Sequence, residues 1–276
     1  MLEFSTQLTH SLLRQFVPSY RFLKIQADTI DRHHVHHTAL ESSSITVLNW
    51  NIAKNNHDRQ WLKDFRSMVR HYRPDLIFLQ EVRFDLDAAH AVDLPDMSWS
   101  YAPNFIDAHH QAYSGVLTAA KTNPIQSRAL VTEHFEPIVQ TPKVSLVTEY
   151  PLNHRSQTLL AINSHLINFV DLQTFRTQLR DLEQAIATHQ GPIIFAGDFN
   201  TWSGSRSTAL EQAATRLGLQ EASFSPDDYR KIKRFLLSPP LDYIFYKQLR
   251  EHRVNARVLH HITSSDHKPL LTEFSC

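Results

Sequence analysis

From residue 45 onward the chain repeats one pattern, in which a short apolar run is followed directly by polar residues. A short apolar run bounded by polar or turn residues is typical of a buried strand. One polar tip is weak evidence, because a charged residue after a strand is usually on the surface and Asp-x-Asn is often a turn. Six such tips predict a single site built on the ends of rigid strands. They are Asn49-Trp50-Asn51, Gln80-Glu81, Asn163-Ser164-His165, Gly197-Asp198-Phe199-Asn200, Leu241-Asp242-Tyr243 and Ser264-Ser265-Asp266-His267.

Hydrophobic periodicity predicts two helices among these strands. Residues 59–71 and residues 172–188 each repeat apolar side chains at helical spacing. Strands are expected at residues 45–50, 76–79, 115–120, 143–150, 158–163, 192–196, 241–246, 253–260 and 269–274. Strands outnumber helices and many are neighbours in the sequence, which favours an α/β fold of mixed sheets packed together with helices outside.

Residues 1–44 differ from the rest of the chain. They lack strong strand signals and are interpreted as an N-terminal arm, partly helical at residues 5–16, ahead of a catalytic domain over residues 45–276. The arm contains the run His33-His34-Val35-His36-His37. That run either binds a transition metal or is a solvated surface loop.

Composition limits the kind of protein and its partners. Lys plus Arg and Asp plus Glu number 28 each, so the formal net charge is zero and any polyanion must be recognised by local patches. The only cysteine is the last residue, Cys276, which excludes an intramolecular disulfide and a cysteine-based zinc site. No apolar stretch is long enough to span a bilayer, and the N-terminus does not read as a signal peptide. We expect a soluble, cytoplasmic protein with no obligatory protein partner evident, with secretion by a signal-less route left open.

The polar tips also carry a family resemblance. Seven blocks resemble the signature blocks of the endonuclease/exonuclease/phosphatase superfamily, in order and with their spacing preserved from about residue 45 to residue 274. Within that superfamily the chain looks closest to small bacterial members of the YafD type. The resemblance implies a four-layer α/β sandwich, with two mixed β-sheets flanked by helices, and hydrolysis of a phosphate ester. The blocks are Leu48-Asn49-Trp50-Asn51-Ile52, Leu79-Gln80-Glu81-Val82, Ser114-Gly115-Val116, Ser164-His165-Leu166, Gly197-Asp198-Phe199-Asn200, Leu241-Asp242-Tyr243-Ile244-Phe245 and Ser265-Asp266-His267-Lys268-Pro269.

A metal ion is part of what the resemblance implies. Glu81 is the best candidate for the metal carboxylate, and Asn51 would add an amide oxygen. So few hard oxygen ligands suit Mg²⁺, which keeps several waters, and Mn²⁺ could substitute for it. Asp266 either lies beside the metal or orients a neighbouring group.

The same blocks imply the catalytic residues. Asp198 is the expected general base, which orients or deprotonates the attacking water, and Asn200 should hold a phosphoryl oxygen or a water of the metal. His267 is the expected phosphate-facing histidine. Asp242 would accept a hydrogen bond from the other ring nitrogen of His267 and fix its tautomer, or would only be a buried hydrogen-bonding group.

His165 and Asn168 discriminate between branches of the superfamily. A His-Leu pair resembles the deoxyribonuclease, sphingomyelinase and deadenylase branches, and Asn168 matches a phosphate-contacting asparagine. A deoxyribonuclease would also place an acid near Ser114-Gly115 to pair with the histidine, and this sequence has none there. His165 is therefore expected to donate a hydrogen bond to the phosphate rather than to form half of an acid–base dyad.

The substrate is least constrained by the sequence. A basic segment holds Arg230, Lys231, Lys233 and Arg234 next to Phe235. It would suit a nucleic-acid backbone with a stacked base, an anionic lipid headgroup with its acyl chains, or simply an exposed loop with Phe235 in the core.

The resulting hypothesis is a Mg²⁺-dependent phosphodiesterase that acts on nucleic acid. The alternatives are the same chemistry on a phospholipid, sphingolipid or phosphoinositide, and a non-catalytic binding protein on the same scaffold.

Overall fold

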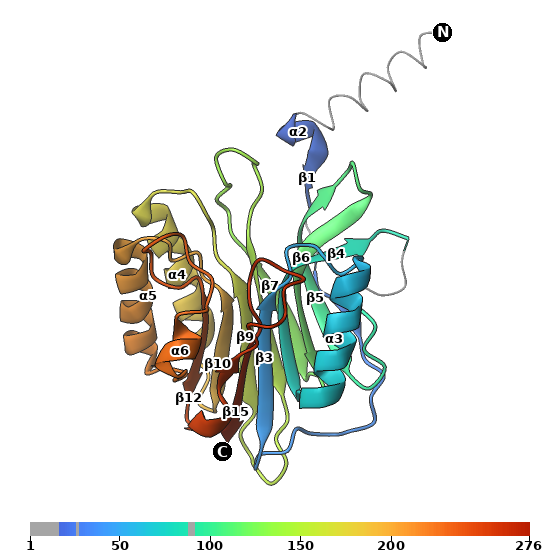
Figure 1. Ribbon diagram of the computed structural model, residues 1–276, viewed down its shortest axis with the longest axis vertical. Helices are drawn as coiled ribbons and strands as arrows, with labels where there is room; N and C mark the ends of the chain where they lie inside the picture. Colours follow the sequence, from blue (N-terminus) through green and yellow to red (C-terminus); the bar gives the residue numbers. More distant parts are fainter. Residues whose placement is uncertain (1–16, 26–27, 88–91) are drawn as a thin grey trace.

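The computed structural model describes residues 17–25, 28–87 and 92–276, which form two stacked mixed β-sheets with helices on the outer faces (Figure 1). This is the α/β sandwich that the sequence predicted. The first sheet contains β1 (Phe22–Lys24), β2 (Ile30–Arg32), β3 (Ile45–Asn51), β4 (Leu76–Asp85), β5 (Ser98–Asp107), β6 (Ala112–Ala120), β13 (Arg250–Glu251), β14 (Arg257–Val258) and β15 (Leu270–Ser275). The second sheet contains β7 (Gln126–Val131), β8 (Val144–Tyr150), β9 (Leu159–His165), β10 (Ile193–Asp198), β11 (Gln220–Glu221) and β12 (Asp242–Lys247).

A parallel strand pair in each sheet decides where the polar tips meet. In the first sheet β3 is parallel to β4, and in the second β9 is parallel to β10. Parallel strands end at the same edge of a sheet, so the polar residues that follow them are brought side by side. In the second sheet Asp198 lies opposite both His165 on β9 and Asp242 on β12.

The core between the sheets is built from strand residues of both. Ile45 and Val47 of β3 pack in one cluster with Ala161 of β9 and with Ile194 and Ala196 of β10. Every one of these side chains is fully buried. Burial on both faces explains why these strands are continuous apolar runs in the sequence rather than alternating ones.

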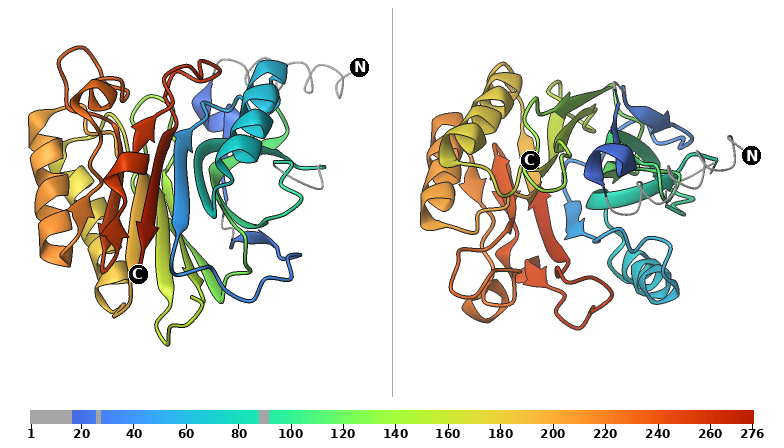
Figure 2. Two further views of the ribbon diagram at one scale, coloured as in Figure 1. Left: turned by 60° about the horizontal axis from the view of Figure 1, so that its bottom comes forward. Right: turned by 90° about the horizontal axis from the view of Figure 1, so that it is seen from above.

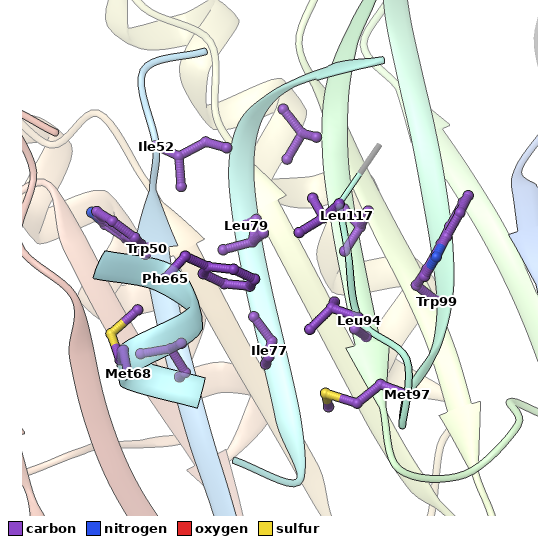
Figure 3. Packing of buried hydrophobic residues seen from close by; sticks show 14 of the residues in the cluster. Trp50, Ile52, Phe65, Met68, Ile77, Leu79, Leu94, Met97, Trp99 and Leu117 are labelled. Carbon is purple, nitrogen blue, oxygen red and sulfur yellow. The ribbon is translucent and has the colours of Figure 1, made fainter. Parts of the chain in front are cut away.

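The long helices cover the outer faces of the sheets. Helix α3 (Arg59–Tyr72) is capped by Asp58, whose carboxylate accepts hydrogen bonds from the first free backbone N–H groups. The helix packs Trp61, Phe65 and Met68 on the first sheet (Figure 3). Helices α4 (Leu172–Ala187) and α5 (Gly204–Leu217) lie together on the second sheet (Figure 2). The single-turn helices are α2 (Pro18–Arg21) and α6 (Pro226–Tyr229), and residues 253–255 form a 3₁₀ turn. No helix of the described residues is long and apolar enough to cross a bilayer.

Several elements differ from the sequence prediction. The strand expected at residues 253–260 is wrong, because residues 253–255 form the 3₁₀ turn and only Arg257–Val258 pair as a strand. Strand β5 was missed because Pro103 interrupts its pattern, and the pairing register of β5 with β6 shifts between Pro103 and Phe105. Strand β7 was missed because it is a largely exposed edge strand. Helix α5 was also missed.

The N-terminal segment takes part in the first sheet. Strands β1 and β2, which the sequence did not signal, both pair with β5, and the guanidinium of Arg21 donates to the carboxylate of Asp107. The helix expected at residues 5–16 lies outside the described residues. His34 is held by contacts to Pro95 and Ser98, and the histidines of residues 33–37 form no cluster of three metal-type ligands with other described residues.

Candidate active site

The strand tips meet in a cleft of about 310 Å³ at the ends of both parallel pairs. Glu81, His165, Asp198, Asn200 and His267 all line this cleft. Two of them have a left-handed backbone, with φ of 54° at Glu81 and 49° at Asn200. Non-glycine residues adopt this conformation at a cost that the surrounding structure must offset, and such residues cluster at functional sites. At Glu81 the conformation coincides with a break in the pairing of β4 with β6 between Leu79 and Val82.

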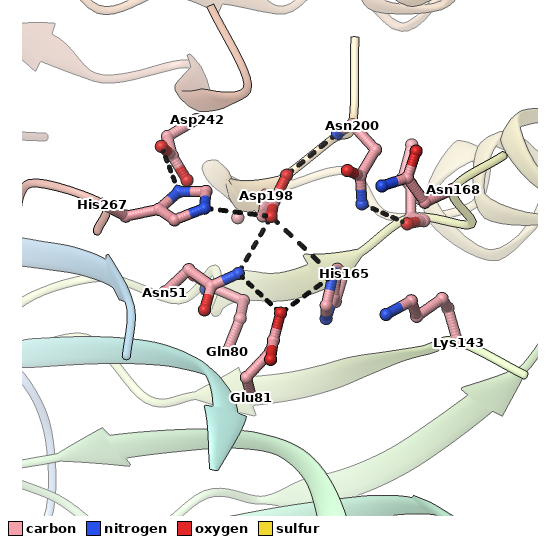
Figure 4. A network of polar contacts seen from close by, with 12 residues as sticks. Asn51, Gln80, Glu81, Lys143, His165, Asn168, Asp198, Asn200, Asp242 and His267 are labelled. Carbon is pink, nitrogen blue, oxygen red and sulfur yellow. Dashed lines mark hydrogen bonds and ion pairs between the residues drawn. The ribbon is translucent and has the colours of Figure 1, made fainter. Parts of the chain in front are cut away.

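The Asp198 carboxylate is the meeting point of the site (Figure 4). Its Oδ2 accepts a hydrogen bond from Asn51 Nδ2 at 2.9 Å, and its Oδ1 accepts one from the backbone N–H of Asn200 at 3.0 Å. The same Asn51 Nδ2 lies 3.3 Å from Glu81 Oε1. Asn51 therefore bridges a carboxylate of the first sheet and a carboxylate of the second.

Below these residues, buried amides lock the two sheets together. Gln80 Nε2 donates to Asn49 Oδ1 at 2.9 Å and to Asn163 Oδ1 at 2.7 Å, and Asn163 Nδ2 donates to the carbonyls of Leu79 and Leu117. Asn49 Nδ2 also donates to the carbonyl of Gly197 at 3.4 Å. Gln80 directly precedes Glu81 and Gly197 directly precedes Asp198, so these contacts constrain the distance between the two carboxylates, although Gln80 Oε1 has no hydrogen-bond partner among the described residues.

His267 lies between two carboxylates. Its Nδ1 is 2.8 Å from Asp242 Oδ2, and its Nε2 is 3.9 Å from Asp198 Oδ2. Burial disfavours the charged ring, but Asp242, Asp198 and Asp266 outweigh it and raise the pKa of His267 to about 10. The ring is therefore an imidazolium at neutral pH, with Nδ1–H donated to Asp242 and Nε2–H available in the cleft.

His165 lies on the other side of Asp198, with Nε2 at 3.7 Å from Asp198 Oδ2 and 4.0 Å from Glu81 Oε1. Burial and the positive charge of Lys143 lower the pKa of His165 to about 4, against the attraction of both carboxylates. His165 is therefore neutral at neutral pH, and its role as a hydrogen-bond donor to phosphate stays a prediction.

The phosphate-contact candidates Asn168 and Asn200 are positioned by other side chains. Asn168 Oδ1 accepts a hydrogen bond from Trp202 Nε1 at 2.8 Å, which leaves its Nδ2 as the free donor in the cleft. Asn200 Nδ2 donates to the carbonyl of Leu166 at 2.8 Å. Trp202 therefore holds the carboxamide of Asn168 in place.

The buried Arg206 holds the two loops that carry Asn168 and Asn200. Its guanidinium donates to the carbonyls of Ile167, Val170 and Asn200 at 2.8–3.0 Å, and the side chain is 1% exposed. Sequence reasoning missed Arg206, because an arginine in a helix is usually exposed.

Lys143 is a second functional candidate that the sequence did not reveal. It lines the cleft beside His165, and its Nζ lies 3.5 Å from the buried carboxylate of Glu136, which also accepts from the backbone N–H of Asn168. Strand β8 is antiparallel to β9, so the start of β8 meets the end of β9. Searching the starts of antiparallel strands, and not only the ends, would have found Lys143.

The basic segment is only partly directed to the cleft. Lys233 lines it and pairs with Asp266 at 2.9 Å. Arg230 pairs with Asp227 and Lys231 pairs with Asp228, away from the lining residues. Arg234 donates to the carbonyl of Tyr229 and also does not line the cleft. Phe235 lines the cleft and is 46% exposed, so it is not a core residue.

Glu81 is well suited to hold a hard cation. Against the cost of burial, His165, Lys143 and Lys54 lower the pKa of Glu81 to about 2, so the carboxylate is ionised. Its side chain is 29% exposed in the cleft. Asn51 Oδ1 accepts from the backbone N–H of Ala53 at 3.0 Å, and the carboxylate of Asp266 is paired with Lys233. Asn51 Oδ1 and the Asp266 carboxylate each keep a further lone pair beyond these contacts, which a metal ion could use.

A second group of metal-type ligands is formed by Asp198, Asp242 and His267, whose ligand atoms lie within 4.8 Å of one another. This group is less suitable, because both ring nitrogens of His267 face carboxylates and an imidazolium has no free lone pair for a metal. The chemistry of the donors therefore favours Glu81.

Comparison with known proteins adds independent information. Residues 48–267 match the model of the Endonuclease/Exonuclease/phosphatase family. A UPF0294 protein of Klebsiella pneumoniae is 35% identical over 234 residues, which cover 84% of this chain and 82% of the relative. An endonuclease/exonuclease/phosphatase from Beutenbergia cavernae has a similar structure, with a TM-score of 0.67, 15% identity, and coverage of 84% of this chain and 72% of the other. The human Nocturnin catalytic domain, solved with a bound sulfate anion, gives a TM-score of 0.60 at 19% identity over 90% of this chain and 97% of its own.

Proposed function

The chain belongs to the endonuclease/exonuclease/phosphatase family, and from that membership and the geometry of its cleft we propose that it is a divalent-metal-dependent phosphodiesterase. The observation that carries the proposal is the convergence on Asp198 of Asn51 from the first sheet and of His165 and His267. The chain has the full set of candidate site residues that a working hydrolase needs, namely Asn51, Glu81, His165, Asp198, Asn200, Asp266 and His267. A non-catalytic scaffold would not need to retain them.

Each of these residues has a separate role in hydrolysis. Asp198 accepts the proton of the attacking water. Burial raises the pKa of Asp198, although His267 and His165 lower it, and the raised pKa makes the carboxylate a better base. The imidazolium of His267 donates Nε2–H to the phosphoryl group, where negative charge develops. Neutral His165 and Asn168 Nδ2 add donors on the other side. Mg²⁺ held at Glu81 would neutralise phosphoryl oxygens, and Mn²⁺ would substitute for it.

Turnover of a small soluble diester tests this proposal. We expect hydrolysis of bis(p-nitrophenyl) phosphate with Mg²⁺, none with EDTA, and a loss of about 10³-fold in turnover for Asp198→Asn. Asp181→Asn, an exposed change on α4, is the matched control and should keep the wild-type rate. Wild-type turnover in EDTA, or in Asp198→Asn, would contradict the proposal.

Nucleic acid is one candidate substrate. Helix α3 and the residue that caps its end expose five cations at helical spacing, namely Arg59, Lys63, Arg66, Arg70 and Arg73, which suits a row of phosphates. None of these five lines the cleft, however, and Arg66 is already paired with Asp93.

A phospholipid, sphingolipid or phosphoinositide is the second candidate. It is favoured by apolar side chains that are exposed at the mouth of the cleft, among them Phe169 and Phe235.

A further inference from the structure

Exposed apolar side chains lie on loops that line the cleft. We call this set the apolar rim, and it consists of Ile138, Phe169, Phe235, Leu236 and Leu237. Leu236 is 97% exposed, Leu237 102% and Ile138 75%. Soluble proteins scatter single apolar residues over their surfaces, whereas a group around one opening marks a contact site.

Three separate segments supply the rim. They are the loop between β7 and β8, the loop that follows β9, and the loop that precedes β12. Each also contributes an apolar side chain to the lining of the cleft, namely Val139, Phe169 and Phe235 respectively. Segments far apart in the sequence therefore present the same chemistry at one place.

The exposed conformations are held by hydrogen bonds rather than left loose. Phe169 and Leu236 have left-handed backbones, with φ of 53° and 49°, which are costly for such side chains. The N–H of Phe169 is bonded to Asn168 Oδ1 at 2.9 Å, and the tip around Leu236 is closed by two bonds between Phe235 and Ser238. The fold thus keeps these side chains in solvent despite the free-energy cost of their left-handed backbones.

The chemistry of the rim distinguishes between ligands. Nucleic-acid bases are bound by stacking on aromatic rings, but the most exposed rim residues are the aliphatic Ile138, Leu236 and Leu237, which have no π face. Aliphatic side chains gain most by insertion among acyl chains. The cations Lys54, Lys143 and Lys233 line the cleft itself and suit an anionic headgroup phosphate.

We propose that the apolar rim docks on a phospholipid bilayer and presents the headgroup phosphodiester to Asp198 and His267. This inference rests on the proposed function for its catalytic part, and the docking itself does not depend on it. Water attacks phosphorus, the bond to one ester oxygen breaks, and the proton of the water passes to Asp198 and from there to solvent. The leaving oxygen takes up one proton from solvent, so that one phosphate monoester and one alcohol leave.

Vesicle flotation with the full chain tests the docking. We expect binding to vesicles of phosphatidylcholine with 30% phosphatidylserine, and a fall in affinity of about tenfold or more for the double variant Leu236→Asn/Leu237→Asn. Asparagine tolerates the left-handed backbone at residue 236, so the variant should fold. Ile125→Asn/Val254→Asn is the matched control, because both residues are exposed aliphatics on segments that contribute no residue to the lining of the cleft, and it should bind as the wild type does.

The outcomes separate this inference from the proposed function. Hydrolysis of bis(p-nitrophenyl) phosphate should be equal in the wild type and the Leu236→Asn/Leu237→Asn variant, while release of phosphorylated headgroup from vesicles falls about tenfold or more in the variant. Equal vesicle binding by both proteins, or no binding by the wild type, would overturn the docking even if the soluble diester is cleaved. A variant that loses affinity for a single-stranded oligonucleotide but not for vesicles would assign the rim to nucleic acid and overturn it too. Absence of soluble-diester turnover would reject the proposed function and leave the flotation result standing.

Discussion

Two histidines lie on either side of the Asp198 carboxylate, and their surroundings shift their pKa values in opposite directions. Burial and Lys143 lower the pKa of His165 to about 4, whereas Asp242 and Asp198 overcome the effect of burial and raise that of His267 to about 10. A pair of titratable groups whose pKa values are separated by their environments is typical of sites with divided acid and base roles.

The raised pKa of His267 makes stability depend on pH. The folded pKa lies above the unfolded value, so the stabilisation is complete below about pH 6.5 and is lost as the pH rises through about 10. We expect the free energy of unfolding, measured with urea in EDTA, to fall by a few kcal/mol over that range in the wild type. His267→Asn should be less stable at pH 6.5 and nearly flat above it. The exposed His261→Asn should keep the wild-type slope. An unchanged slope in His267→Asn would show that the histidine is not charged in the fold.

Lys143 should contribute charge to the reaction and not only to the fold. With Lys143→Met we expect turnover of a soluble diester to fall about 10²-fold, because one cation facing the phosphate is lost. The pKa of His165, followed by NMR, should rise at the same time, since Lys143 is one of the groups that lower it. Lys143→Arg should restore part of the rate. Lys121→Met, an exposed lysine paired with Asp75, should change neither quantity. A stability loss without a shift in the pKa of His165 would indicate a purely structural role.

Whole elements were predicted from the sequence where burial was complete. Strand β3 and helix α3 were found within a residue or two, because an uninterrupted apolar run and a helical period are both unambiguous. Strand β5 was not predicted, because Pro103 and polar side chains hide its pattern and its pairing is decided by β6. The role of Arg206 was not predicted either, because only the fold brings its carbonyl partners together.

Helix α5 should depend on Arg206 for its attachment to the site. Arg206→Met removes three hydrogen bonds and leaves buried carbonyls unpaired, so we expect a loss of about 3 kcal/mol or more in the free energy of unfolding. Arg216→Met, on the same helix, breaks an exposed pair with Glu183 and should cost about 1 kcal/mol or less. Urea unfolding of the two variants makes the comparison. Equal losses would contradict the role assigned to Arg206.

At the scale of the whole molecule, the site exists only because the two sheets are packed in one fixed relative position. Glu81 belongs to the first sheet and Asp198 to the second, and the buried amides of Asn49, Gln80 and Asn163 connect them. The sequence named the residues of each tip, but the distances between tips follow from sheet packing. The metal ligands remain a prediction for the same reason, since they depend on how both sheets face one ion.

Binding of Mg²⁺ should stabilise the whole chain if the ion joins these elements. At tenfold excess over its Kd, a ligand of the folded state adds about 1.4 kcal/mol, which corresponds to a rise of about 3–5 °C in Tm for a domain of this size. We expect this rise in the wild type, and none in Glu81→Gln. Glu211→Gln, on the outer helix α5, is the control and should respond as the wild type does. Asp242→Asn separates the two possible ligand groups, because it removes a ligand only from the set of Asp198, Asp242 and His267. If Mg²⁺ still raised the Tm of Glu81→Gln but no longer raised that of Asp242→Asn, the ion would be assigned to the group that contains His267. Glu81 would then not be the metal ligand.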